Sequence, residues 1–88
     1  PMIVGAQAAN ELLNIIGVRA SFVLTKYNGT VFISARAIDE VNVQLIMERI
    51  GGGGHMNIAG AQLTNLSIEA AEAKLKQVLT DMIDGGEL

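Results

Sequence analysis

Apolar residues recur at helical spacing in three segments of the chain. In residues 5–16 they stand at i, i+3, i+4 and i+7 and a glycine follows them, so we predict a first helix there. The same reasoning predicts helices over residues 42–50 and 68–83. The apolar stripes of the three helices are Ala9, Leu12, Leu13 and Ile16; Val43, Ile46, Met47 and Ile50; and Ile68, Ala71, Leu75, Val78, Leu79 and Met82. The expected N-cap residues are Asp39 or Asn42 for the second helix and Ser67 for the third.

Alternation of apolar and polar residues predicts two strands, at residues 19–27 and 30–38. Asn28-Gly29 stands between them, and this dipeptide favours a type I′ hairpin turn, whose two central residues both need positive φ. A short apolar stretch bounded by turn residues, residues 59–63, predicts a third strand.

The two faces of the predicted hairpin differ in polarity. A two-residue turn fixes the register, and the expected pairs are Tyr27–Thr30, Thr25–Phe32, Val23–Ser34 and Ser21–Arg36. Alternation then gives one face that is core, with Phe22, Leu24, Val31, Ile33 and Ala35. The other face is mixed, and its end far from the turn brings Ser21, Ser34 and Arg36 together.

The predicted order of elements is α-β-β-α-β-α, a small α/β sandwich with a mixed sheet flanked by helices. A right-handed crossover is expected to carry the second strand through the second helix to the third strand, if those strands are parallel. The 88 residues suffice for one domain. Half of them are apolar and only three are aromatic, so the core is expected to be aliphatic.

Charge and composition exclude several classes of function. A net charge of −3 argues against sequence-independent binding of long nucleic acid, which relies on a basic face. The absence of cysteine excludes disulfides and thiolate metal sites. No apolar run approaches the roughly 20 residues of a membrane span, and the start lacks the basic region of a signal peptide. Because the chain opens with Pro1 and runs quickly into a predicted helix, we expect it to be a fragment of a longer protein.

Four consecutive glycines, Gly51 to Gly54, precede His55, the only histidine of the chain. Each fixed glycine costs roughly 0.5–1 kcal/mol relative to alanine. One of them is explained as the C-cap of the second helix, and three have no capping role. The run is not a Walker motif, because it follows a helix and lacks the Gly-Lys-Ser/Thr ending. Either its N–H groups or a helical turn starting near His55 would bind an anion. The alternative is a flexible connection.

Two charged or titratable residues are candidates for chemistry. His55 would donate a hydrogen bond to a phosphate or base edge, or protonate a leaving oxygen; the alternative is a surface histidine with no special partner. Arg36 would clamp a phosphate beside the Ser34 hydroxyl; the alternative is an arginine paired with Asp39 or Glu40. No metal site is expected within these residues, because no second histidine or cysteine exists and the carboxylates show no ligand spacing.

The motif Gly52-Gly53-Gly54-His55-x-x-x-Ala59-Gly60, with Ser34-x-Arg36 on a strand before it, resembles the DHH-associated domain of DHH-family phosphoesterases. The resemblance covers nearly the whole chain. It is strongest to the GdpP type, membrane-anchored phosphodiesterases that degrade cyclic di-AMP, in three stretches: Ala8-Ala9-Asn10-Glu11-Leu12-Leu13, Ala20-Ser21-Phe22-Val23-Leu24 and Gly60-Ala61-Gln62-Leu63. One departure is Ile58, where the common pattern has an alanine before Ala59.

The resemblance implies a division of labour in a longer enzyme. Manganese would be bound by a preceding DHH domain of the same chain, and this domain would hold an adenine nucleotide or cyclic dinucleotide. The substrate-binding residues it implies are Ser34, Arg36, Gly52, Gly53, Gly54, His55, Ala59 and Gly60, with His55 also a possible proton donor. The domain would be cytoplasmic in a protein anchored in the membrane, without direct membrane contact of its own, and inactive alone. The alternative is a non-catalytic module that binds a ligand or forms a homodimer; binding of single-stranded nucleic acid is a weaker third reading.

Overall fold

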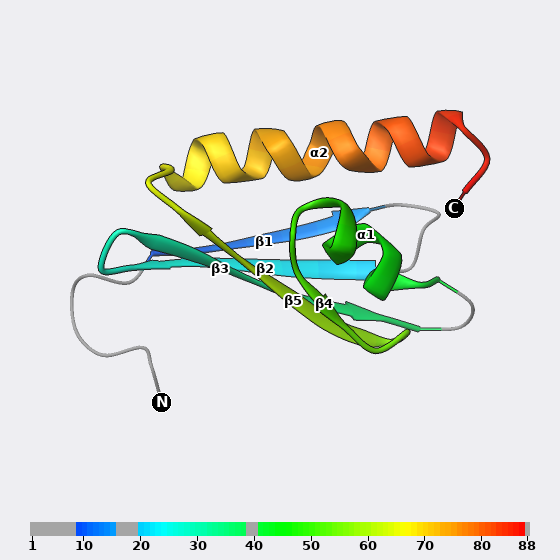
Figure 1. Cartoon of the computed structure of the whole chain (residues 1–88), viewed down its shortest axis with the longest axis horizontal. Coiled ribbons are helices and arrows are strands. Elements are labelled where there is room, and N and C mark those ends of the chain that lie inside the picture. The colour runs from blue at the N-terminus through cyan, green and yellow to red at the C-terminus, as the bar shows by residue number, and fades with distance from the viewer. Residues whose placement is uncertain (1–8, 16–19, 39–40, 88) are drawn as a thin grey trace.

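The computed structural model describes residues 9–15, 20–38 and 41–87, which form one five-stranded sheet and two helices. The elements are β1 (Ala9–Ile15), β2 (Ala20–Tyr27), β3 (Thr30–Ala37), α1 (Val43–Arg49), β4 (Gly53–Gly54), β5 (Ile58–Thr64) and α2 (Ile68–Asp84). The strand order in the sheet is β1-β2-β3-β5-β4 (Figure 1). All four neighbouring pairs are antiparallel.

The α/β class is confirmed, but two of the predictions about it are wrong. Residues 9–15 of the predicted first helix form β1, which pairs with β2 from Ala9–Lys26 to Ile15–Ala20; the rest of that predicted helix lies outside the described residues. A short apolar segment fits both periodicities, and here the free hydrogen-bonding edge of β2 decides in favour of a strand. The sheet is also antiparallel throughout, not mixed, so no parallel crossover joins β3 to β5.

The hairpin of β2 and β3 has the predicted turn and register. Asn28 and Gly29 both have positive φ, of 55° and 82°, as a type I′ turn requires. The observed pairs run from Tyr27–Thr30 at the turn to Ser21–Arg36 at the far end, as expected. Beyond β3, β5 adds the predicted third strand, with Ser34 opposite Gly60 and Arg36 opposite Ile58.

Both helices cover the same face of the sheet (Figure 1). That face carries the core face predicted for the hairpin, and its five residues are at most 2% exposed. Among the residues whose side chains the structure describes, the core includes Ala20, Phe22, Leu24, Val31, Ile33, Ala35, Val43, Ile46, Met47, Ile50, Ala59, Ala61, Leu63, Ile68, Ala71, Leu75, Leu79 and Met82. The two helices therefore close a single aliphatic core, as the composition suggested.

The helix ends follow the predicted capping residues. Asn42 Oδ1 accepts from the Leu45 amide at 3.3 Å, and Ser67 Oγ accepts from the Ala70 amide at 3.0 Å. α2 ends at Gly85, as predicted. Within the described ranges, neither helix combines the length and apolar character that a bilayer-crossing helix needs.

The opposite face of the sheet is not covered by either helix, and we call it the open face. Its outward side chains on β2, β3 and β5 include Val23, Phe32, Ser34, Arg36, Ile58 and Gln62. Most of these are exposed, and Phe32 is half-buried. A sheet with one solvated face is ordinary for antiparallel strands, but this one presents polar and apolar groups that are available to a ligand or another protein surface.

Candidate functional site

The strand pairings arrange the open face in cross-strand rows. One row holds Ser21, Arg36 and Ile58, from β2, β3 and β5. The next holds Val23, Ser34, Gly60 and Gly53, from β2, β3, β5 and β4. Neighbours within a row are about 5 Å apart, and successive rows on one face are about 7 Å apart. Antiparallel pairing therefore brings Ser34 and Arg36, the strand residues predicted to bind substrate, close to the glycine run.

Arg36 is exposed near the end of β3, on the open face. Its guanidinium pairs with no carboxylate among residues 20–38 and 41–87. The two acids considered as partners from the sequence, Asp39 and Glu40, lie outside the described residues. The Ser34 hydroxyl is two residues away on the same face, so a cation and a hydroxyl point to the same region of solvent.

The first two amides of the glycine run do not bind an anion. Gly51 N–H donates to the Glu48 carbonyl at 3.1 Å, and Gly52 N–H donates to the Met47 carbonyl at 2.8 Å. With Gly51 at φ 98° after the C-cap Ile50, these bonds close the end of α1. The expectation that the N–H groups of the run converge on an anion is thus wrong for these two, because the last carbonyls of α1 take them.

Gly53 and Gly54 form β4, a strand that the sequence analysis did not predict. They pair with Gly60 and Ala59 of β5. A two-residue strand made of glycine has no side chains to alternate, so nothing in the hydropathy pattern indicates it. The glycine run was alternatively expected to be a flexible connection, but Gly53 and Gly54 are paired backbone at the edge of the sheet.

The four glycines have different reasons to be glycine. A Cβ on Gly52 would lie 2.1 Å from the Gly60 carbonyl oxygen, and one on Gly54 would lie 2.5 Å from Ala59 Cα. Gly54 also has φ 145°, and Gly51 has φ 98°. A Cβ on Gly53 would meet nothing within 4 Å, and its φ lies outside the left-handed range. Of the run, Gly53 alone is not required by the fold.

His55 is exposed and begins the turn from β4 to β5. Its N–H donates to the Ile58 carbonyl at 2.7 Å, so the segment is a hairpin turn and not the helical turn considered from the sequence. The turn is held at both sides, because Ala37 N–H donates to the Asn57 carbonyl at 3.0 Å and Val43 N–H to the Met56 carbonyl at 2.9 Å. His55 is therefore fixed next to Ile58, which in turn faces Arg36.

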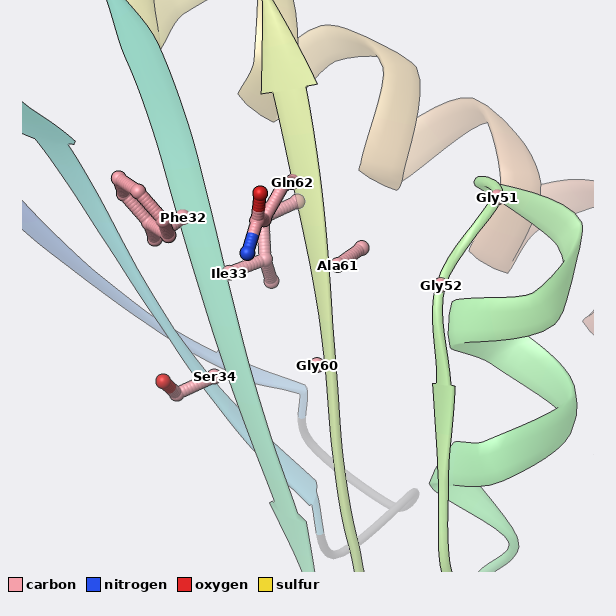
Figure 2. Close-up of a pocket in the computed structure, with 8 residues that line it drawn as sticks. All are labelled: Phe32, Ile33, Ser34, Gly51, Gly52, Gly60, Ala61 and Gln62. Carbon is pink, nitrogen blue, oxygen red and sulfur yellow. The ribbon is translucent and has the colours of Figure 1, made fainter.

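A hollow of about 500 Å³ lies where the glycine run passes β5. It is lined by Phe32, Ile33, Ser34, Gly51, Gly52, Gly60, Ala61 and Gln62. Figure 2 shows Phe32, Ser34 and Gln62 directed to one side of the strands and Ala61 directed to the other, toward α1. Three of the lining residues are glycines, so part of this hollow is bare main chain.

The structure separates the predicted site residues into two groups. Ser34, Arg36, Gly53, His55 and Gly60 lie on or beside the two rows of the open face. Ala59 points into the core and is 8% exposed, so its side chain lies on the other face. Two residues that line the hollow, Phe32 and Gln62, were not selected from the sequence; strand alternation from Ser34 and Gly60 is the signal that would have found them.

Metal ligands do not gather anywhere in the described ranges: no group of three histidine, cysteine, aspartate or glutamate side chains is placed to hold an ion there. The residues that the structure describes therefore do not form a manganese site.

Comparison with known proteins shows the family of this chain. The profile of the DHHA1 domain matches residues 2–84, and the chain belongs to the DHHA1 domain family. This confirms the resemblance to the DHH-associated domain.

Three phosphodiesterases contain a region similar to this chain. The cyclic-di-AMP phosphodiesterase GdpP of Geobacillus thermodenitrificans is 51% identical over 83 residues, which are 93% of this chain and 13% of that protein. GdpP of Bacillus subtilis is 45% identical over 82 residues, 92% of this chain and 12% of that protein. The cyclic-di-AMP phosphodiesterase PdeA of Listeria monocytogenes is 46% identical over 74 residues, 83% of this chain and 11% of that protein. The chain thus corresponds to a small part of each relative.

Proposed function

We propose that this chain is the substrate-binding domain of a longer, manganese-dependent phosphodiesterase that hydrolyses cyclic di-AMP or short oligonucleotides. The names of three similar proteins support the substrate class. Within the chain, the proposal is carried by one observation. Arg36 and Ser34 of β3 lie on two adjacent rows of the open face, and His55, which is remote from them in sequence, lies beside these rows next to bare glycine backbone.

The chemistry of these groups suits a phosphodiester. A guanidinium binds two phosphate oxygens at once, and a serine hydroxyl and an imidazole N–H add further donors. Gly60 and Gly53 add no side chain to the row of Ser34, so a ligand can approach the sheet backbone there. The site therefore combines hydrogen-bond donors from Arg36, Ser34 and His55 with main chain that carries no side chain at Gly53 and Gly60.

The C-terminal end of α1 is not expected to bind the phosphate. The C-terminal end of a helix carries partial negative charge, which repels phosphate. Here the amides of Gly51 and Gly52 are bonded to the last carbonyls of α1 and are not available. We therefore place the phosphate over the open face, near Arg36 and Ser34, and not at the end of α1.

In this proposal the hydrolytic machinery lies elsewhere in the longer protein. A preceding DHH domain of the same chain would bind the manganese, and the protein would be anchored in the membrane with both domains in the cytoplasm. The present domain contributes by orienting the phosphodiester, since a well-oriented reacting group lowers the entropic part of the barrier.

The test is an assay of cyclic di-AMP hydrolysis with manganese, run on the 88-residue chain and on the complete protein that contains it. The proposal predicts turnover by the complete protein and none by the chain alone. Robust turnover by the isolated chain would refute the division of labour. A complete protein that leaves both cyclic di-AMP and short oligonucleotides intact would refute the substrate class.

A further inference from the structure

We infer that Phe32 and Gln62 form a base-binding subsite next to the rows of Arg36 and Ser34, where the phosphate is proposed to bind, and that Gln62 selects adenine. This inference rests on the proposed function, because it takes the ligand to be a nucleotide. Phe32 of β3 is directly opposite Gln62 of β5, in the row that follows Ser34 and Gly60.

The position of this row fits one nucleotide. It is about 7 Å from the row of Ser34, because two residues of a strand span that length. A phosphate beside Ser34 therefore leaves room for one sugar before the base reaches Phe32 and Gln62. Both side chains line the same hollow as Ser34 and Gly60, and Figure 2 shows them on the same side of the sheet.

Phe32 supplies an aromatic surface where the fold does not need one. The other phenylalanine of the chain, Phe22, is fully buried in the core, at 0% exposed. Phe32 is instead half-buried on the solvated face, at the border of the hollow. Stacking on an aromatic side chain tolerates any base, because every base has a π-face. Phe32 is therefore expected to add affinity without selectivity.

Gln62 supplies the groups that distinguish bases. It is exposed, and its carboxamide makes no hydrogen bond to another residue in the described part of the chain. By contrast, Gln44 and Gln77 bond to Glu48 and Asp81 on their own helices. A glutamine amide recognises adenine with two hydrogen bonds, accepting from N6 and donating to N7. Guanine presents an acceptor, O6, in place of the N6 donor, so the same amide cannot make both bonds.

The experiment compares kcat/KM for cyclic di-AMP and cyclic di-GMP in the complete protein. Gln62→Leu is expected to lower kcat/KM for cyclic di-AMP by roughly 5- to 150-fold and to lower the ratio of the two substrates. Gln62→Arg is expected to shift that ratio further toward guanine, since arginine bonds to O6 and N7. Phe32→Leu is expected to lower both values by a similar factor. The control is Thr64→Ala, an exposed position further along β5, which should change neither value.

The ratio of two substrates in one preparation does not depend on how much of the protein is folded, so a folding defect cannot imitate the result. If both Gln62 variants keep the ratio of the unsubstituted protein, the base subsite is refuted. If that happens while Arg36→Ala still weakens hydrolysis of both substrates, the proposed function stands and only this inference fails. If the unsubstituted protein hydrolyses neither dinucleotide, this inference fails; if it also leaves short oligonucleotides intact, the proposed function fails with it.

Discussion

Arg36 of β3 and His55 of the β4–β5 turn lie at the same level of the sheet, on either side of Ile58. Arg36 is opposite Ile58 in the ladder, and His55 N–H donates to the Ile58 carbonyl at 2.7 Å. Two strand spacings separate the two backbones, about 10 Å. The Ile58 side chain between them is 57% exposed, so an arginine, an apolar residue and a histidine follow one another at this level of the sheet.

The glycine run allows stability and ligand binding to be separated. Gly53→Ala should leave the free energy of unfolding unchanged or raise it by up to about 1 kcal/mol, because the new methyl meets no atom. The same substitution should weaken binding of linear di-adenylate, because Gly53 shares the row of Ser34 and Gly60. Urea unfolding and calorimetric titration measure the two effects. Gly53→Ala with unaltered affinity would show that this glycine does not face the ligand.

Gly52→Ala is the matched comparison. Its Cβ would lie 2.1 Å from a backbone oxygen of β5, which cannot move aside as a side chain end could. We expect the free energy of unfolding to fall by about 1–3 kcal/mol. Stability equal to that of the unsubstituted chain would mean that the run does not approach β5 as closely as described.

Arg36→Ala should weaken binding of the dinucleotide by roughly 10- to 150-fold, the range for a lost hydrogen bond to a charged group. Stability should change by less than about 0.5 kcal/mol, because the side chain is exposed. Lys74→Ala removes the same charge from the exposed side of α2 and serves as the control. Equal losses of affinity in the two variants would indicate a general charge effect and not a phosphate contact.

His55 can be tested as a positioning group or a proton donor. Glutamine keeps an N–H donor but does not exchange protons, so in the complete protein His55→Gln should keep both kcat and KM within about threefold of their original values if His55 only positions the substrate. A fall in kcat with little change in KM would instead show that the imidazole transfers a proton. His55→Ala should raise KM in either case. An alanine variant with unchanged kinetics would remove His55 from the site.

The N-cap of α2 should contribute measurably to stability. Ser67 Oγ accepts from the Ala70 amide at 3.0 Å, and Ser67→Ala leaves that amide to water. We expect a loss of about 1 kcal/mol in the free energy of unfolding, with binding unaffected, since α2 covers the opposite face of the sheet. Ser67→Asp should restore most of the loss. Thermal and urea unfolding of the three proteins give the comparison.

The parts of the fold that were predicted correctly are governed by local chemistry. Asn28-Gly29 determines the turn, the turn determines the register, and the register places Ser34 and Arg36 on one face. The last helix is similarly defined by Ser67, Gly85 and an apolar stripe between them. In each case a few neighbouring residues fix the structure, so reading the sequence in short windows suffices.

The parts that were missed depend on contacts between distant segments. Residues 9–15 suit a helix until the free edge of β2 is considered, and that edge is remote in sequence. The bonding of the Gly51 and Gly52 amides depends on where α1 ends, and the β4 pairing depends on the approach to β5. Strand alternation put Ser34 and Arg36 on one face, and the same alternation extends to Phe32 and Gln62. That these two side chains lie opposite each other follows only from the β3–β5 register, which joins distant segments.

The most direct test of the central claim is an NMR titration of the chain with linear di-adenylate, following backbone amides and the Arg36 side chain. We predict shifts at Ser34, Arg36, Gly53, His55 and Gly60, the residues of the two adjoining rows. Amides of α2 should not move, because that helix covers the other face. Shifts confined to the helices or to the β1 edge, with Arg36 and His55 unmoved, would contradict the claim that the open face holds the phosphate.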